Sequence, residues 1–451
     1  MRSAITLLLI SSCATAAFAR EEVKRDFSRT APLPAGRQLR IEHRHGRVSV
    51  KTHNRPEVQI AAVIRCSAPT ANEARGCADR IQVIVQESAS GVSVRTEFPQ
   101  NLRNVGFSVE CDITMPDTSP LDLRNQFGSV DVSSLHANAT IRNGNGPVAF
   151  LAGKGQHRIE NSFGNTEVRN NDGDVTIVNG NGSVLATDIT GALDITNRFA
   201  SIRVANAGRS LTIHSNNGNI EADNIGGIAN ISNTFGRVAV NDAKSDLLVQ
   251  NQNGDVAVNG VAGNAGLNTT FAAITFTKIG KGLTVHAQNA QIRGDGVGES
   301  AAVETTFGAV DLRNVRGGAK VTTGNSPVKL ATIGGEVYTR SSFAAVTITD
   351  SPGPVTVEAQ NGPVVVEAKN AGACKPMSLR TTFGLIRATI PAGIGYNLSA
   401  QTTFGRIHAG PGVQIAVTGD ISPNNLSGKI GAGGCDLRLT AQNSNIDILS
   451  R

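Results

Sequence analysis

The sequence contains no tryptophan and only two tyrosines, Tyr338 and Tyr396, among its 451 residues. Grooves that bind sugars generally stack the sugar rings on Trp or Tyr, so this scarcity argues against carbohydrate chemistry. Charged residues make up only 17% of the chain and form no basic run. Binding to nucleic acid needs clustered cations with stacking aromatics, so we expect no nucleic-acid partner. The net charge of +6 permits only weak attraction to an anionic surface.

Long apolar runs are also missing. No segment holds the ~18 or more apolar residues of a membrane helix, so we expect no transmembrane segment. Residues 1–19 are instead typical of a secretion signal, with Arg2, an apolar run from Ile5 to Ile10, and a small-x-small cleavage site ending at Ala19. A second interpretation takes Cys13 as a lipidated lipobox cysteine, which would make the signal unusually short. The sequence predicts an exported chain that is periplasmic, held at the outer surface or secreted.

Cysteines are few, and removal of the signal leaves an odd number: Cys66, Cys77, Cys111, Cys374 and Cys435. In a compartment where disulfides form, Cys66 and Cys77 are the favoured pair because they close a short loop. A bond between Cys374 and Cys435 would leave Cys111 free, and burial of all five as reduced thiols is the open alternative. Spacings typical of a zinc module are missing, and we expect no metal or cofactor.

The dominant feature that is present is a repeat. Phenylalanines recur every 36 residues, and asparagines lie midway between them. They are Phe127, Phe163, Phe199, Phe235, Phe271, Phe307 and Phe343, with Asn145, Asn181, Asn217, Asn253, Asn289, Asn325 and Asn361. The period is therefore 18 residues, and Phe and Asn alternate at one position, which we call position zero. The next residue is Gly, Ala or Ser in all fourteen copies, which indicates a tight corner.

Apolar residues alternate on both sides of this corner. A β-branched residue stands three places after position zero, and an aliphatic residue stands four places before it in nearly every copy, as in Ile202 and Ile195. Alternation at a period of two indicates strands, and copies that cannot bury their strands alone must stack. The sequence predicts an all-β fold, a single-stranded parallel β-solenoid with 18-residue coils.

Two positions of the coil are expected to form ladders. Two places before position zero, mostly Asn residues such as Asn161 and Asn197 predict a buried polar ladder bonded between copies. Position zero itself is expected to face inward or to line the corner. On the inward alternative, Phe235→Asp would bury an unpaired charge and destabilise the fold strongly.

The template extends beyond the main block. It fits residues 39–50 and 437–448, and further copies contain Phe383 and Phe404. The insertion before residue 121 is predicted as strands with a short helix over residues 71–80 that caps the first coil and shields its edge. The expected organisation is a signal over 1–19, a first coil and capping insertion over 20–120, the solenoid over 121–410, and an excursion with a final coil over 411–451.

The segment from Leu39 to Val130 resembles the bacterial putative-adhesin family of β-strand-repeat proteins. The resemblance is carried by the runs IEHRHG from Ile41, RPEV from Arg55, and LDLRN from Leu121, which leads into Phe127-Gly128; the ending over 426–448 is similar too. It covers nearly all of the mature chain, but its motifs prescribe no catalytic residue. The resemblance implies an extracytoplasmic solenoid with a role in adhesion or envelope stress.

Catalytic and metal sites have few candidates. Exported β-helices include polysaccharide lyases and hydrolases, whose paired carboxylates lie about 5–9 Å apart. Asp172 with Asp174 and Asp242 with Asp246 are such candidates, although each aspartate is also typical of a solvated turn. Three histidines, His43, His45 and His53, are the candidate metal ligands, although they occupy template positions that favour packing.

We predict a non-enzymatic exported solenoid whose extended surface serves adhesion, ligand binding or cell-envelope structure. Its partner would be an envelope or surface ligand, either protein or glycan. The alternatives are a polysaccharide-active enzyme and a filament subunit that associates end to end.

Overall fold

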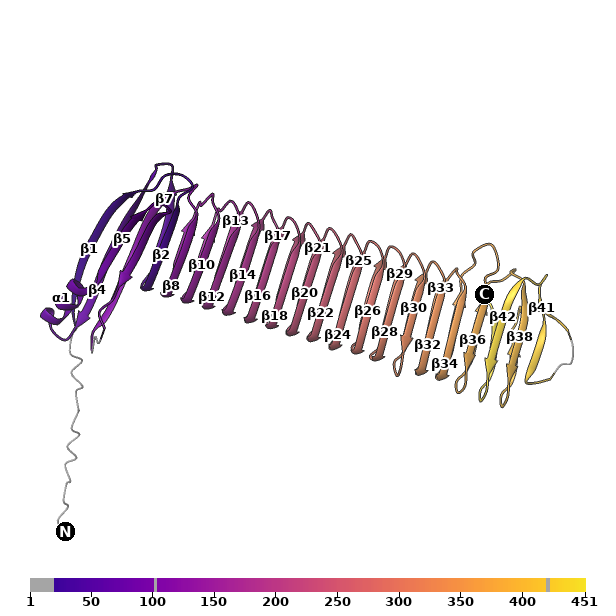
Figure 1. The fold of residues 1–451 in the computed structure, drawn as a ribbon. Coiled ribbons are helices and arrows are strands. Elements are labelled where there is room, and N and C mark those ends of the chain that lie inside the picture. Colours follow the sequence, from indigo (N-terminus) through magenta and orange to yellow (C-terminus); the bar gives the residue numbers. More distant parts are fainter. Residues whose placement is uncertain (1–19, 101–103, 419–421) are drawn as a thin grey trace, which may run out of the picture. The chain divides into compact units, whose positions relative to one another are not determined.

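The computed structural model describes residues 20–100, 104–418 and 422–451. The chain divides into two compact units, of which one ends at Leu135 and the other spans His136–Arg451. Within the second unit, strands stack one behind the next along a row of similar coils (Figure 1). The predicted parallel β-solenoid with 18-residue coils is confirmed.

Each coil of the second unit contributes one strand to each of two parallel sheets. The register follows the repeat, so that Ile195 pairs with Ile213 in one sheet and Val204 pairs with Ala222 in the other. Sheet A contains β11 (Val148–Leu151), β13 (Thr166–Asn171), β15 (Val184–Ile189), β17 (Ile202–Ala207), β19 (Ile220–Ile225), β21 (Val238–Ala243), β23 (Val256–Val261), β25 (Ile274–Ile279), β27 (Ile292–Val297), β29 (Val310–Val315), β31 (Val328–Ile333), β33 (Val346–Ser351), β35 (Val364–Ala368), β37 (Ile386–Ile390), β43 (Ile446–Ser450) and β39 (Ile407–Ala409). Sheet B contains β10 (Ala139–Asn145), β12 (His157–Phe163), β14 (Val175–Asn181), β16 (Leu193–Phe199), β18 (Leu211–Asn217), β20 (Ala229–Phe235), β22 (Leu247–Asn253), β24 (Ala265–Phe271), β26 (Leu283–Asn289), β28 (Ala301–Phe307), β30 (Ala319–Thr323), β32 (Val337–Phe343), β34 (Val355–Asn361), β36 (Met377–Thr381), β42 (Cys435–Ala441), β38 (Tyr396–Thr402), β41 (Asn425–Ile430) and β40 (Ile415–Val417).

The core lies between the two sheets and follows the alternation of the sequence. In β16, Leu193, Ile195 and Asn197 are buried while the residues between them face solvent. Burial of each aliphatic side chain stabilises the fold by about 1.5–3 kcal/mol, and stacking repeats that contribution in every coil. The two outer faces are thereby left free of any role in the core.

The polar ladder two places before position zero is buried, but its bonding differs from the expectation. Asn197 Nδ2 donates to the carbonyl oxygens of Gly182, Phe199 and Ala200, at 3.3, 3.0 and 3.2 Å. A bond between ladder members occurs where Asn179 Nδ2 donates to Asn197 Oδ1 at 3.2 Å. The ladder therefore mainly donates to backbone carbonyls at the corner.

A second corner contains a left-handed residue that the sequence analysis did not identify. Positive φ angles recur every 18 residues at Asn170, Asp188, Asn206, Asn224, Asp242, Gly260, Lys278, Gly296, Asn314, Thr332 and Asp350. Most of these residues are Asn, Asp or Gly, which tolerate this conformation best. Asn206 Nδ2 also donates to Asp188 Oδ1 at 2.6 Å, which links successive coils on the outside.

Chain order and spatial order differ at the C-terminal end of the second unit. β42 pairs with β36 on one side and with β38 on the other, so the final coil of the sequence lies between two earlier coils. β43 likewise lies between β37 and β39. The free edge of β38 is covered by β41, which runs antiparallel and pairs in turn with β40.

The first unit contains the first coil and its cap. Its elements are β1 (Glu21–Pro32), β2 (Gln38–His45), β3 (Val48–His53), β4 (Glu57–Ala68), α1 (Ala71–Arg80), β5 (Gln82–Ser88), β6 (Gly91–Glu97), β7 (Gly106–Pro116), β8 (Leu121–Phe127) and β9 (Val130–Ser133). β2 lies between β6 and β8, and β3 lies between β7 and β9, so the insertion covers one edge of the first coil. The sequence analysis did not predict β1, which pairs antiparallel with β4.

The predicted helix is confirmed. It spans Ala71–Arg80, and the side chain of Thr70 accepts a hydrogen bond from the backbone N–H of Glu73. This bond satisfies one of the amide donors that a helix leaves free at its start.

Candidate functional site

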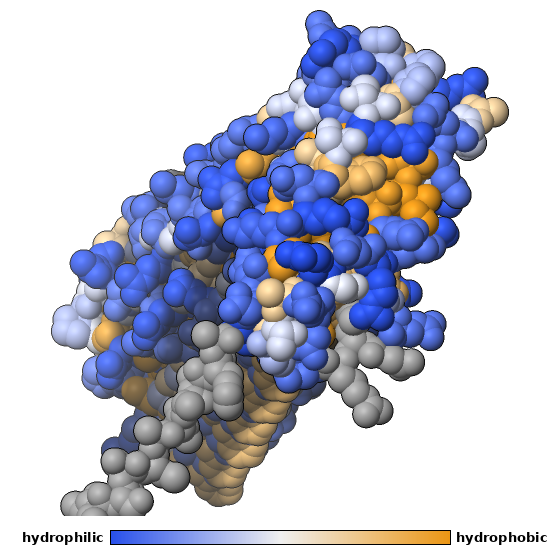
Figure 2. Space-filling view, turned by 90° about the vertical axis from the view of Figure 1, so that its left-hand side faces the viewer, coloured by the Kyte–Doolittle hydropathy of each residue, from blue (hydrophilic) through white to orange (hydrophobic). Residues whose placement is uncertain are grey.

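Position zero lies at the corner where the strands of sheet B end. An apolar band runs along the lower edge of the coils in Figure 2, and the phenylalanine side chains are about half exposed, as in Phe235 at 51%. They line the corner, so the inward alternative is wrong. At a half-exposed position, Phe235→Asp would not bury its charge, so the strong destabilisation predicted on the inward alternative is not expected. In the second unit the exposed rings belong to Phe163, Phe199, Phe235, Phe271, Phe307, Phe343, Phe383 and Phe404, and we call them the phenylalanine ridge.

An asparagine separates one ring of the ridge from the next where strand pairing sets the register; between Phe307 and Phe343 the strand ends at Thr323, before Asn325. Phe199 pairs with Asn181 in the coil before it and with Asn217 in the coil after it. The same order holds at the C-terminal end only in space. Thr381 and Thr402 both pair with Ala441, so Asn443 lies between Phe383 and Phe404 in space. In the sequence, these two phenylalanines belong to successive copies of the repeat, with no copy that has asparagine at position zero between them. The folded chain thus restores an alternation that the linear repeat had lost.

The first unit shows what a ring at position zero does next to a phenylalanine at the same position of the adjacent coil. His45 holds that position beside Phe127, and the two rings stack with centroids 5.1 Å apart and an interplanar angle of 1°. Phe98 and Phe107 meet the edges of His45 at 5.1 Å each. Burial, and then the charge of Arg44, lower the pKa of His45. The space beside a ring at this corner therefore accepts a second flat ring.

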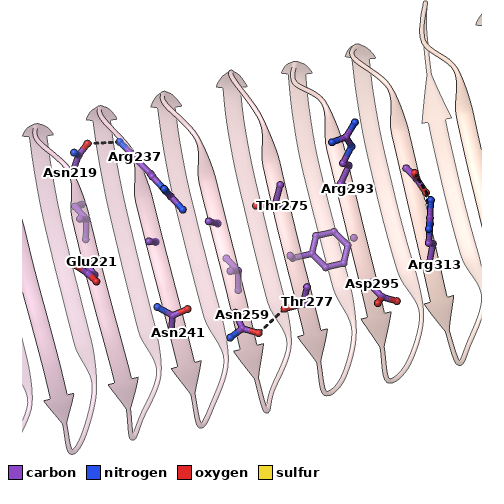
Figure 3. Close-up of a pocket in the computed structure, with 17 residues that line it drawn as sticks. Asn219, Glu221, Arg237, Asn241, Asn259, Thr275, Thr277, Arg293, Asp295 and Arg313 are labelled. Carbon is purple, nitrogen blue, oxygen red and sulfur yellow. Dashed lines mark hydrogen bonds and ion pairs between the residues drawn. The ribbon is translucent and has the colours of Figure 1, made fainter.

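The outer face of sheet A is hollowed over the middle coils of the second unit (Figure 3). This polar hollow has a volume of about 980 Å³. Its floor is a row of small side chains on successive coils, Ala239, Ala257 and Thr275. Larger residues of the same row, Glu221 and Arg293, close its ends. The hollow exists because small residues replace long ones on neighbouring coils.

Two ion pairs lie at the polar hollow. Glu221 accepts hydrogen bonds from Arg203 at 2.5 and 2.9 Å, and Arg313 pairs with Asp311 at 3.1 Å. Thr277 donates to Asn259 at 2.6 Å along the lower rim in Figure 3. The arrangement offers amide, hydroxyl and guanidinium groups around an apolar floor, which suits a polar ligand that lies along the sheet.

The outer face of sheet B carries a second hollow, over some of the same coils as the polar hollow. This apolar hollow has a volume of about 1170 Å³ and lies between Leu248 and Tyr338. One outward-facing row of sheet B, which contains Leu248 and Tyr338, also contains the small residues Gly266 and Ala302, and these form the floor of the hollow. Sequence reasoning missed both hollows, although a run of small residues at one outer position of the repeat was the signal that could have found them.

Three of the four candidate aspartates interact with neighbouring coils. Asp174 accepts a hydrogen bond from the backbone N–H of Ala192 at 2.8 Å, and Asp246 accepts one from Asn264 at 2.7 Å. Asp172 lies 3.6 Å from Lys154. Asp242 takes the left-handed corner position. Each of these four aspartates therefore has a structural role at a corner.

Each of the three candidate histidines makes contacts of its own. His43 is buried with its Nδ1 3.0 Å from Thr96 Oγ1, His45 packs among phenylalanines, and His53 Nδ1 accepts from the backbone N–H of Arg55 at 3.0 Å. Burial lowers the pKa of His43 to about 4 and raises the pKa of the neighbouring Cys111 to about 12. Within the described ranges, no group of three or more His, Cys, Asp or Glu side chains is placed to hold a metal ion.

Two disulfides join four of the cysteines. Cys66 in β4 is bonded to Cys77 in α1, and Cys374 is bonded to Cys435 at the start of β42. Cys111 is a free, buried thiol. The proposed signal and Cys13 lie outside the described residues. Among the residues that are described, no helix has the length and apolar character needed to cross a membrane.

A protein-family model matches much of the repeat region. The model of the Toastrack family, DUF4097, matches residues 197–449. No curated protein matches the chain. A solved structure of a putative cell adhesion protein from Clostridium sporogenes is similar at 8% identity, covering 95% of this chain and 100% of its own, with a TM-score of 0.16. A likeness with so low a TM-score supports no conclusion about function.

Proposed function

This chain belongs to the Toastrack family, DUF4097, and on that premise we propose that it is an exported, non-enzymatic β-solenoid. Its role is to present an extended surface for ligand binding, in adhesion or in cell-envelope structure. The observation that carries the proposal is the pair of hollows on the outer faces, the polar hollow on sheet A and the apolar hollow on sheet B. Neither face has a role in the core, so both are available for binding.

The environment of the acidic side chains supports binding rather than catalysis. A glycosidase needs one carboxylate that gives a proton and another that acts as base or nucleophile. Asp174 and Asp246 are instead hydrogen-bonded to backbone N–H groups of the next coil. Their geometry serves the stacking of coils, and no observation favours the polysaccharide-active alternative.

The two disulfides support export. Disulfides form and persist in oxidising compartments and are rare in the cytosol. The bond between Cys374 and Cys435 links positions 61 residues apart and holds the start of the final coil. An exported solenoid gains from such a bond because no reducing system acts on it there.

A substitution that fills the apolar hollow tests the proposal. Ala302→Arg places a long side chain on the floor, where Lys320 of the next coil shows that the outer row accepts one. We expect the purified variant to lose most of its retention on intact cells and on isolated envelopes of the producing organism. The matched control is Thr212→Arg, which adds the same side chain to the same row outside the hollow.

The two readouts are bound fraction and turnover. Equal retention of Ala302→Arg, Thr212→Arg and the unmodified chain would refute a binding role for the hollow. Chain cleavage on a panel of neutral and acidic glycans would refute the non-enzymatic assignment. Folding of each variant is checked by circular dichroism, and both are expected to melt near the unmodified chain because the substituted positions face solvent.

A further inference from the structure

The phenylalanine ridge is a large apolar feature with a fixed period. Eight exposed rings follow one edge of the second unit, from Phe163 to Phe404; seven are about half exposed and Phe404 is 78% exposed. A Phe side chain has roughly 200 Å² to bury, so the eight rings expose on the order of 800 Å². The largest apolar patch of an ordinary monomer covers about 300–600 Å², whereas a standard protein interface buries about 800 Å² on each partner. The ridge therefore has the area of an interface.

The spacing of the rings restricts what can cover them. Neighbouring coils lie about 4.8 Å apart, so rings on alternate coils repeat at roughly 9.6 Å. A flat ring placed midway between two of them would lie about 4.8 Å from each, inside the roughly 4.5–7 Å range of favourable aromatic pairs. Each asparagine, as Asn217 between Phe199 and Phe235, forms the floor of such a slot.

The first unit shows an occupied slot of this kind. His45 fills the position next to Phe127, and the rings stack face to face at 5.1 Å. In the second unit an asparagine, which is shorter than a ring, takes the equivalent place beside every ridge phenylalanine. The slots of the ridge are thus shaped for rings that the second unit does not itself supply.

We propose that a second copy of this chain covers the ridge, with the phenylalanines of each copy entering the asparagine slots of the other. A partner that fills several slots at once must carry rings at the same two-coil period, and a second copy does so by construction. The contact would use the same surface on both copies and would close as a two-fold dimer. This side-by-side pairing differs from end-to-end growth, which would use strand edges.

The flanks of the ridge permit close approach of a like-charged molecule. The net charge of +6 opposes self-association in general. The residues that follow the ridge phenylalanines are small and neutral: Gly164, Ala200, Gly236, Ala272, Gly308, Ala344, Gly384 and Gly405. Thr or Ser precedes every ring except that of Phe199, which follows Arg198. The residues beside the rings therefore present neither large side chains nor a repeated charge that would prevent a second ridge from approaching.

Sedimentation equilibrium of the full chain, from nanomolar to high micromolar concentration, tests the proposal. We expect a monomer–dimer equilibrium without higher species. The variant that carries Phe199→Asn, Phe235→Asn, Phe271→Asn and Phe307→Asn should dimerise at least about thirtyfold more weakly, since each aromatic contact is lost. It should remain folded, because asparagine occupies the same position on adjacent coils.

A second variant separates interleaving from general stickiness. Asn217→Phe, Asn253→Phe and Asn289→Phe together add apolar surface but fill three slots from within the chain. Interleaving predicts weaker dimerisation of this variant, whereas non-specific hydrophobic association predicts stronger dimerisation and would overturn the proposal.

Two further results would overturn it. One is an unmodified chain that stays monomeric at every concentration, including the case in which its ridge binds lipid vesicles instead. The other is a series of growing oligomers that both variants retain, which would assign association to the strand edges. Unfolding curves of the variants accompany each measurement, so a loss of dimer by a folded protein is distinguished from a loss of fold.

Discussion

A buried histidine makes the stability of the solenoid dependent on pH. His157 holds an inward position of sheet B where the adjacent coils carry Ala139 and Val175. Its side chain is 3% exposed, and its ring centroid lies 4.3 Å from that of Phe150. Burial lowers the pKa of His157 from 6.5 to about 4, and the nearby Asn171 side chain opposes this only in part. The folded state therefore holds a neutral imidazole.

The direction of the effect follows from proton binding. Because the pKa of His157 is lower in the folded chain, the unfolded chain binds a proton over the window from pH 6.5 down to about 4 that the folded chain does not. Stability is therefore complete above pH 6.5 and falls as the pH falls through the window. A shift of about 2.5 units makes the loss about 3 kcal/mol by pH 4.

The assay compares the unmodified chain with His157→Val by urea unfolding at neutral pH and near pH 4. Valine occupies this position in the next coil, so we expect His157→Val to change stability at neutral pH by less than about 1.5 kcal/mol. Between the two conditions the variant should lose about 3 kcal/mol less than the unmodified chain. His43 titrates in both proteins and cancels in the comparison. Equal losses in both proteins would refute neutral burial of His157.

Three other changes have expected outcomes. Asn197→Ala removes the side-chain hydrogen bonds to corner carbonyls and should lower the free energy of unfolding by about 1–3 kcal/mol, whereas Asn197→Thr should cost less, both read from urea curves. In Gly294→Ala the new Cβ would overlap the buried Phe276 ring, so the melting temperature should fall clearly, and Phe276→Val in the same chain should recover it. Replacing Cys66 and Cys77 by serine should destabilise the first unit by about 2–3 kcal/mol in denaturant unfolding followed by hydrogen exchange; unchanged protection there would contradict a stabilising bond.

Much of the fold could be predicted from the sequence because its contacts are set by a period. Alternation around a corner determines strands, and an 18-residue repeat places each residue beside its counterpart in the next coil, as Ile195 beside Ile213. The helix after Thr70 was equally readable, since its cap is local. β1 was not predicted, because an edge strand without the repeat has no such signal.

The candidate site depended more on the tertiary structure. Side-chain direction at position zero cannot be read from alternation, because the corner breaks the strand geometry there, and only the folded chain shows that Phe235 is half exposed. Both hollows require outer rows such as Ala239 and Ala257 to be viewed as neighbours in space.

The sequence by itself determined the repeat, the two strands of each coil, the inward aliphatic positions and the alternation of Phe with Asn. Only the tertiary structure decided which way the rings point and where the final coil goes. The final coil places Asn443 between Phe383 and Phe404 because β42 pairs with β36 and β38, a choice among strand edges distant in sequence. Local pattern sets what a coil is, whereas long-range strand pairing and packing at the corners set which surface the stack of coils presents.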